Sequence, residues 1–260
     1  MKKFFIAVGR EAISFFYFLG GLANLTGHTF YWLFVPPFRK DRVFEQAKKA
    51  GYDSLLLVSL IAFFIGVILA LQTAVMMQRL GSEMYIASIV AISIVRELGP
   101  VITALVVAGR VGAAIAAEIG SMQVTEQIDA LESFATNPIK YLVVPRLLAL
   151  TVTVPILTIY SDLVGILGGY LICVYKLGIS SSMYLHITFD GLQLKDVFTG
   201  LFKTFFFGMI IAFVSCYEGF NVEGGAEGVG KATMRAVVSA FILIIAADCF
   251  LTAIFYFVFP

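Results

Sequence analysis

Long runs of apolar residues, separated by short polar segments, dominate the sequence. A membrane-spanning helix needs roughly 20 mostly apolar residues. The runs that meet this length are residues 54–78, 85–117, 142–175, 197–217 and 235–259. The second and third are longer than one bilayer core of ~30 Å requires, so they must tilt, bend or extend beyond it. The pattern predicts an all-α integral membrane protein with five transmembrane helices.

The segment before the first run has a different pattern. Residues 11–35 are rich in Phe and Tyr and contain Trp32, but glycines and polar residues interrupt them. Aromatic side chains favour the membrane–water interface, so we expect an interfacial helix here rather than a sixth span. A basic amphipathic segment follows, which suits an anionic membrane surface. We therefore divide the chain into an N-terminal cytoplasmic or interfacial helical segment, 1–53, and a five-helix transmembrane domain, 54–260.

The distribution of Lys and Arg predicts the orientation. Basic residues collect on the cytoplasmic side of membrane proteins. An N-terminus inside and a C-terminus outside would put twelve basic residues on the cytoplasmic segments and three on the outer loops. The twelve are Lys2, Lys3, Arg10, Arg39, Lys40, Arg42, Lys48, Lys49, Lys140, Arg146, Lys231 and Arg235, and the three are Arg79, Lys176 and Lys195.

Composition supports a membrane protein and excludes some functions. Of the 260 residues, 60% are hydrophobic and 13% charged, whereas soluble domains are about 45–50% apolar and about 25% charged. The net charge of +1 gives no reason to expect nucleic-acid binding. The three cysteines lie in apolar runs and have no metal-ligand spacing, so we expect no metal site.

The stretch SIVRELGPV places charges inside the second apolar run. Arg96 and Glu97 each cost roughly 2.5–3.5 kcal/mol at the centre of a membrane helix. Pro100 has no N–H and so frees the carbonyl of residue 96, and Gly99 loosens the same turn. We interpret the stretch as a kinked wall of a polar cavity, with Lys203 as the best basic partner for Glu97. The alternative is a buried structural ion pair.

The segment between the second and third runs predicts a short amphipathic helix at about 119–136. Thr125 can cap a helix that begins at Glu126, and Asn137-Pro138 can end it. Its apolar positions recur at helical spacing, and its opposite face is acidic. This helix either lies on its own bundle or docks a cytoplasmic partner. The apolar positions are Val124, Ile128, Leu131 and Ala135, and the acids are Glu126, Asp129 and Glu132, with Glu118 upstream.

Two further features invite a functional interpretation. Asp162 and Asp248 are isolated acids within apolar runs, and we favour a structural role for both, although such groups are functional candidates by default. Gly225, Gly230 and Lys231 fit the start of a phosphate-binding loop, G-x-x-x-x-G-K. Ala232, however, stands where that loop needs Ser or Thr. We interpret this stretch as a flexible connection and expect no nucleotide binding by this chain.

Several motifs together resemble one family. RELGPV, AGRVGAAIAAEIGSM, TEQIDAL and NPIKYLVVPR occur in this order, followed by GVGKATMRAVV and DCFLTA. They are similar to the MlaE-type ABC permeases, whose relatives include the plastid permeases of lipid import. The resemblance covers nearly the whole chain.

The resemblance implies a homodimeric permease of the bacterial inner membrane that moves phospholipid between inner and outer membranes. Cytosolic ATPase subunits, which use ATP and Mg²⁺, would drive it. A small STAS-domain protein and a hexameric ring of MCE-domain subunits on the periplasmic side would join it. The permease itself would be non-catalytic.

The resemblance also implies roles for particular residues. Charged groups of an outward-facing lipid cavity between two subunits would be Arg96, Glu97 and Lys203, and apolar lining would come from Leu69, Met77, Leu80 and Leu98. The ATPase would contact the coupling helix through Glu118, Thr125, Glu126, Gln127, Asp129 and Glu132. Asp248 matches a family position, and Asp162 does not. Two alternatives are an ion-coupled secondary transporter that uses Asp162 and Asp248, and a passive membrane anchor for the MCE ring.

Overall fold

The protein is a bundle of long helices. The computed structural model describes residues 2–36 and 40–258, and the elements in that part of the chain are all helical. The segments long and apolar enough to cross a membrane are Lys40–Arg79 (α2), Glu83–Val124 (η1 to α5), Ile139–Tyr175 (η4 and α7), Leu194–Phe220 (α9) and Gly225–Phe257, which lies in α10 (Gly225–Val258). The prediction of an all-α membrane protein with five spans is confirmed.

The second span is interrupted by wider helical turns. Pro100 lies at the start of α4, directly after the π-helix η2, and the N–H of Gly99 bonds to the carbonyl of Ile94, five residues earlier. The expected weak point at Gly99 and Pro100 is therefore a π-helical turn within a continuous helical path, a feature that often marks functional sites. The consecutive elements are η1 (Glu83–Tyr85), α3 (Ile86–Ser93), η2 (Ile94–Leu98), α4 (Gly99–Val107), η3 (Ala108–Gly112) and α5 (Ala113–Val124).

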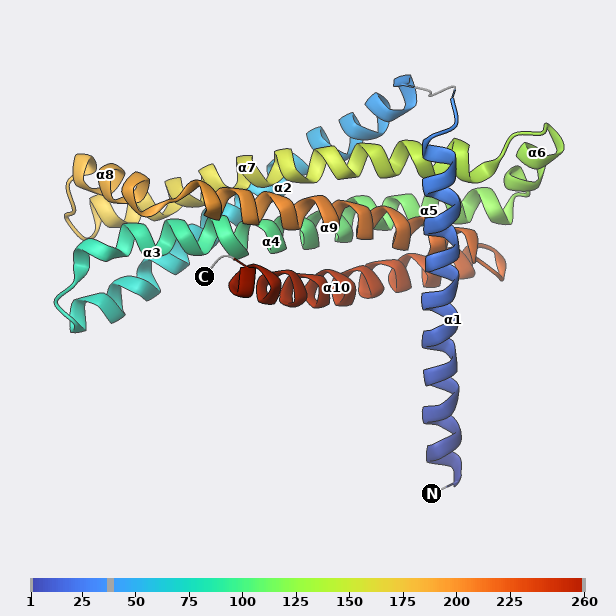
Figure 1. Cartoon of the computed structure of the whole chain (residues 1–260), viewed down its shortest axis with the longest axis horizontal. Helices are drawn as coiled ribbons and strands as arrows, with labels where there is room; N and C mark the ends of the chain where they lie inside the picture. The colour runs from blue at the N-terminus through green and yellow to red at the C-terminus, as the bar shows by residue number, and fades with distance from the viewer. Residues whose placement is uncertain (1, 37–39, 259–260) are drawn as a thin grey trace.

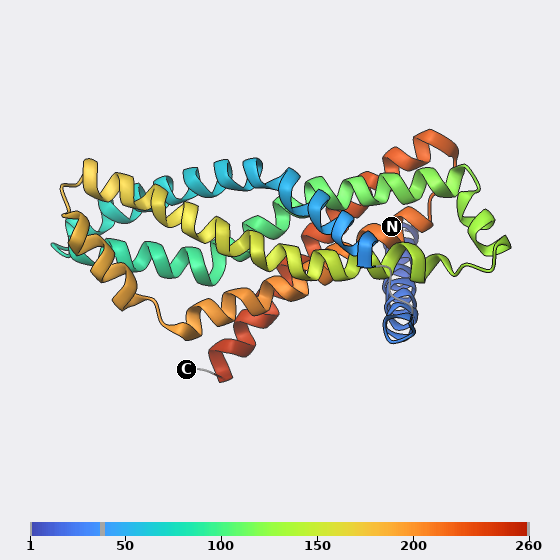
Figure 2. The ribbon, with the colours of Figure 1, turned by 90° about the horizontal axis from the view of Figure 1, so that it is seen from above.

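One helix crosses the direction of all the others. The five spans run side by side, with α6 (Gln127–Ser133) at one end and α8 (Ser181–Gly191) at the other (Figure 1). α1 (Lys2–Leu33) runs at nearly a right angle to them near the α6 end, and Figure 2 shows it almost end-on. If the spans cross a membrane, α1 lies along its surface, in agreement with the interfacial helix expected at residues 11–35.

The helix that begins the transmembrane bundle starts earlier than expected. α2 is continuous from Lys40 to Arg79 and includes the basic segment that precedes the first apolar run. The predicted boundary at residue 53 therefore falls inside a helix. The division into 1–53 and 54–260 remains a prediction based on composition.

Small residues allow the spans to pack closely, as small residues do in membrane bundles. α2 and α7 (Val144–Tyr175) meet where Gly66 faces Gly165, and a Cβ added to Gly66 would lie 1.9 Å from the carbonyl oxygen of Gly165. α4 and α7 meet where a Cβ on Gly99 would lie 1.7 Å from Asp162 Oδ1. Neither contact leaves space for a methyl group, so these glycines fix the distance between helices.

The apolar core has two parts. The larger part joins α5, α7, α9 and α10 and includes Ile119, Leu150, Phe207 and Ile211. The smaller part joins α2, α3, α7 and α8 around Ile86, Val90 and Tyr184. Large apolar side chains also cover the outside, for example Leu56 and Phe64 on α2, which are 74% and 56% exposed. Such a surface suits lipid or another subunit.

Candidate functional site

A buried lysine forms the centre of a charged cluster within the spans. The side chain of Lys203, on α9, is only 2% exposed, and its Nζ lies 2.6 Å from Glu97 Oε2 on η2. Nζ also lies 3.0 Å from Asp248 Oδ1 on α10 and donates to Thr252 Oγ1 at 2.6 Å. The Asp248 contact is an ion pair without hydrogen-bond alignment. The cluster thus ties η2, α9 and α10 together, and the predicted partnership of Lys203 with Glu97 is present.

The π-helical turn supplies another partner for this lysine. Pro100 has no N–H to offer the carbonyl of Arg96. Lys203 Nζ donates to that carbonyl oxygen at 3.3 Å. An ammonium group has three N–H donors, and Lys203 already faces Glu97, Thr252, the Arg96 carbonyl and Asp248. In this arrangement Lys203 has no donor left for a ligand.

Arg96 is the accessible cation of the region. Its side chain is 44% exposed, and its Nε lies 3.6 Å from Asp196 Oδ1 on α9. Asp196 is buried and accepts a hydrogen bond from the Gln193 N–H through Oδ2 at 3.0 Å, as part of a capping box at the start of α9. Sequence reasoning missed Asp196 and Thr252. Two spacings could have indicated them. Asp196 stands three residues after Gln193, as in a capping box, and Thr252 stands one helical turn after Asp248, on the same face of the helix.

The expected apolar lining is not gathered around these charges within one chain. Leu98 borders a narrow crevice between η2, α2 and α7. Leu69 and Met77 pack beside the smaller core, and Leu80 is 66% exposed at the end of α2. α2 packs mainly on α7, whereas Lys203 is on α9. One described chain therefore carries the charged groups and the α2 positions on separate surfaces.

The two isolated acids have different environments. Asp248 belongs to the Lys203 cluster. Asp162 is buried where α7 meets Gly99, and its Oδ1 has no hydrogen-bond partner in the described part of the chain. The structure does not bring Asp162 and Asp248 into one site, since Asp162 lies against Gly99 of α4 and Asp248 lies beside Lys203 of α9.

The opposite end of the bundle carries the acidic helix. In α6, Ile128 is buried, Leu131 is half-buried, and Asp129 and Glu132 are exposed, as is Glu126 at the cap position. The predicted apolar stripe is only partly present, because Val124 and Ala135 lie outside α6 and are exposed. Among the described residues, these three acids form no ion pair within 4 Å. Gln127, at the first position of α6, is also exposed. The helix thus presents exposed acidic side chains, of which Asp129 and Glu132 border a groove beside α1.

The predicted boundaries of this helix were wrong. α5 continues to Val124, so Thr125 follows a helix instead of starting one, and its hydroxyl donates back to the Ser121 carbonyl at 2.8 Å. Glu126 occupies the cap position with φ 57° and makes no side-chain capping bond. The helix ends at Ser133, before Asn137-Pro138. Ala135 has φ 53°, and the Thr136 N–H bonds to the Leu131 carbonyl at 2.9 Å, as in a Schellman ending.

Glu118 differs from the other acids of this region because it has a partner within the chain. Its Oε2 lies 2.9 Å from Arg146 Nη2, and the Arg146 side chain is 4% exposed. Arg146 also donates to the Leu142 carbonyl at 2.9 Å. Glu118 therefore joins α5 to α7. Nearby, Arg235 of α10 pairs with Glu218 of α9 at 2.9 Å.

The glycine-rich stretch is helical, which corrects the expectation of a flexible connection. α10 begins at Gly225, so Gly225 to Lys231 form its first turns, and Lys231 pairs with Glu227 at 2.6 Å. Ala232 is completely buried. A phosphate-binding loop lies between a strand and a helix, whereas this segment forms the first turns of a helix that follows another helix, α9.

Comparison with known proteins identifies relatives that are named as permeases. The family described as Permease MlaE matches residues 43–254. A probable ABC transporter permease protein of Rickettsia typhi is 44% identical over 249 residues, which cover 96% of each chain. The intermembrane phospholipid transport system permease protein MlaE of Haemophilus influenzae is 34% identical over 259 residues, or 98% of each chain. The chloroplastic protein TRIGALACTOSYLDIACYLGLYCEROL 1 of Arabidopsis thaliana is 37% identical over 212 residues, which are 82% of this chain and 61% of that one.

Proposed function

The chain belongs to the MlaE permease family of ABC transporters, and from this premise we propose that it moves phospholipid between inner and outer membranes. The relative from Haemophilus influenzae is named for intermembrane phospholipid transport. The observation that carries the proposal is the charged cluster of η2, α9 and α10, set among spans that are otherwise apolar. A phospholipid needs both, since its tails require apolar surface and its phosphate requires a cation.

The two cations of this region have different proposed roles. Lys203 is buried and fully engaged, so its task is to hold Glu97 and Asp248 in place. Arg96 is exposed and lies 3.6 Å from its only ion-pair partner in the described chain, Asp196. Its guanidinium has five N–H donors, so it is the group we assign to the headgroup phosphate.

The lipid cavity would form between two copies of the chain. A single chain keeps Leu69, Met77 and Leu80 apart from Arg96, and it leaves broad apolar faces uncovered on α2 and α10. A homodimer would cover part of this surface and add the α2 positions of one copy to a wall of the cavity.

The α6 end would dock the cytosolic ATPase subunits. Glu126, Gln127, Asp129 and Glu132 form an exposed surface there, and Thr125 lies at its edge. ATP and Mg²⁺ would be bound by the ATPase and not by this chain, whose G-x-x-x-x-G-K segment is followed by Ala232 where a phosphate-binding loop needs Ser or Thr. Glu118 would act through Arg146, because it ties the helix before α6 to α7.

The proposed setting is the bacterial inner membrane, with the N-terminus cytoplasmic and the C-terminus periplasmic. An MCE-domain ring would then sit at the α8 end, and a STAS-domain protein would accompany the ATPase. The excess of basic residues at the α6 end supports this orientation.

The test is ATP-driven phospholipid transfer by the complex reconstituted in liposomes. Arg96→Gln should lower the transfer rate about tenfold or more, because a charge-assisted hydrogen bond contributes roughly 1.5–3 kcal/mol. Arg79→Gln, at the end of α2, is the matched control and should keep the wild-type rate. Equal transfer by Arg96→Gln and wild type, with ATPase subunits bound in both, would show that Arg96 does not bind the lipid.

A further inference from the structure

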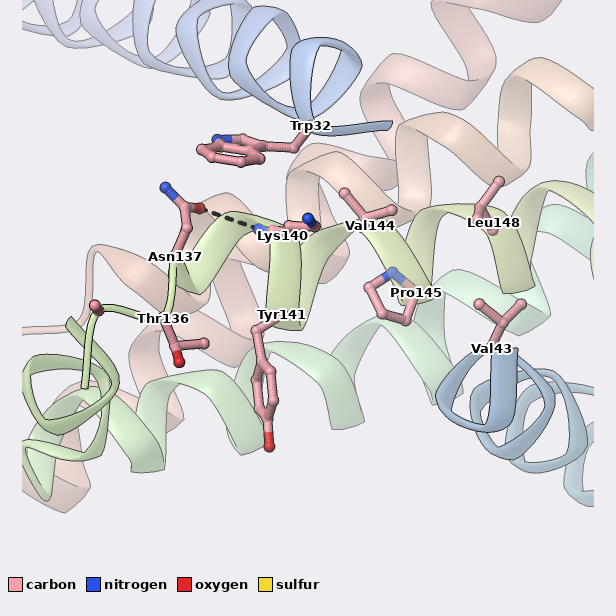
Figure 3. Close-up of a pocket in the computed structure, with 10 residues that line it drawn as sticks. Trp32, Val43, Thr136, Asn137, Lys140, Tyr141, Val144, Pro145 and Leu148 are labelled. Carbon is pink, nitrogen blue, oxygen red and sulfur yellow. Dashed lines mark hydrogen bonds between the residues drawn. The ribbon is translucent and has the colours of Figure 1, made fainter. Parts of the chain in front are cut away.

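A pocket of about 290 Å³ lies at the α6 end of the bundle, outside the charged cluster described above. Its walls come from the end of α1, the first turns of α2, and the start of the third span. Figure 3 shows Trp32 on one side, Val43 on another, and Lys140, Tyr141 and Pro145 along the third span. None of the residues that line it is acidic.

Lys140 brings a positive charge into this pocket without a carboxylate to neutralise it. Its Nζ donates to the Pro36 carbonyl at 3.1 Å and lies 5.4 Å from the centre of the Trp32 ring. Among the described residues, no carboxylate oxygen lies within 4 Å of it. Two of its three N–H donors thus remain for a ligand, and the ring and carbonyl hold the ammonium in place.

A second cation lies behind the pocket wall. The guanidinium carbon of Arg42 is 3.8 Å from the centre of the Tyr141 ring, and Arg42 donates a hydrogen bond to the Tyr141 hydroxyl. In the described part of the chain, Arg42 also has no carboxylate within 4 Å. Both cations are therefore held by aromatic rings and neutral oxygens, which leave the local charge positive.

The other half of the pocket is apolar and leads onto the membrane-facing side of α7. Val144, Pro145 and Leu148 form this half. The same face continues with Val152 and Ile156, which are 58% and 59% exposed, at successive helical turns beyond Leu148. An acyl chain that follows this stripe would start at the pocket and run along α7 toward the other leaflet.

The position of the pocket matches the level of lipid headgroups. α1 crosses the spans near it, and its Trp32 is the type of residue that marks the membrane–water interface (Figure 1). We propose that this pocket binds one anionic phospholipid of the leaflet beside α6, with its phosphate at Lys140 and an acyl chain along Leu148, Val152 and Ile156. The apolar stripe favours a lipid over a soluble phosphate, which would use only the polar half.

Trp32 provides the measurement, because it is the only tryptophan in the sequence. The full chain is placed in nanodiscs that contain either a brominated phosphatidylglycerol or a brominated phosphatidylcholine over the same series of mole fractions. Bromine quenches tryptophan fluorescence only at close range. Wild type should show quenching by the anionic lipid at a mole fraction about fivefold lower, since one Lys near anionic headgroups contributes about that factor.

Two variants complete the experiment. Lys140→Gln should lose the preference for the anionic lipid, and Lys48→Gln, which removes an equal charge from an exposed position of α2, should keep it. Equal quenching of wild type by both lipids, or an unchanged preference in Lys140→Gln, would overturn the proposal. A Trp32 emission shift with inorganic phosphate alone, lost in Lys140→Gln, would assign the pocket to a soluble phosphate instead. None of these outcomes bears on the Arg96 region, so the proposed transport function is tested separately.

Discussion

The Lys203 cluster and the acidic face of α6 are two charged regions of this apolar chain, and they differ in where their charges find partners. Lys203 is buried and meets Glu97, Asp248, Thr252 and the Arg96 carbonyl. The acids of α6 are exposed and form no ion pair with a described residue. A buried charge must find its partners within the protein, whereas an exposed acidic face needs none and is available to another subunit.

The largest effect is expected when the buried cation of the Lys203 cluster is removed. Lys203→Met leaves Glu97 and Asp248 close together without their cation, and removal of one partner of a buried pair costs roughly 3–5 kcal/mol. Thermal unfolding in detergent should show a large loss of stability. Lys195→Met, at an exposed position near the start of α9, is the control and should unfold like wild type. A small change in Lys203→Met would mean that the cluster does not stabilise the bundle.

A smaller effect is expected where the π-helical turn packs on α7. Gly99→Ala places a methyl group against the carboxylate of Asp162, and overpacking of this kind typically costs about 1–3 kcal/mol. Thermal unfolding measures the loss. In a background of Asp162→Ala, the same Gly99→Ala change should cost less stability than it does in wild type. Strict additivity of the two changes would show that the contact is not the cause.

The smallest effect on stability is expected at α6. Glu126→Lys changes an exposed side chain, so unfolding should shift by no more than about 0.5 kcal/mol. Co-purification of the ATPase subunits should nevertheless fall, because the charge of the docking surface is reversed. Glu83→Lys, at the other end of the bundle in η1, serves as the control. Normal ATPase recovery with Glu126→Lys would remove α6 from the docking site.

The sequence predicted features that depend on hydrophobicity and on the cost of buried charge. Apolar runs located the five spans, and the need of Glu97 for a cation identified Lys203. Asp196 and Thr252 were missed because their contacts with Arg96 and Lys203 join helices far apart in the sequence. Local spacing marks each of them as a candidate but does not indicate which side chains meet across helices. The Arg146 pair with Glu118 was missed for the same reason.

Two errors arose where packing prevails over local preference. Glycine disfavours a helix by roughly 1 kcal/mol per residue, so residues 225–231 were expected to be flexible. Packing of α10 on α5, with Ala232 completely buried, stabilises the helix nonetheless. Thr125 was expected to cap a helix, but α5 extends to Val124 and the Thr125 hydroxyl bonds back into that helix.

The central claim is that Arg96 binds the lipid phosphate, in addition to forming an ion pair with Asp196. ATP-driven phospholipid transfer should be compared between Arg96→Gln and Asp196→Asn, which keeps an oxygen for the Gln193 N–H. We predict that Asp196→Asn transfers within about twofold of wild type, while Arg96→Gln falls about tenfold or more. An equal loss in both variants would contradict the claim, because it would mean that their ion pair is all that matters.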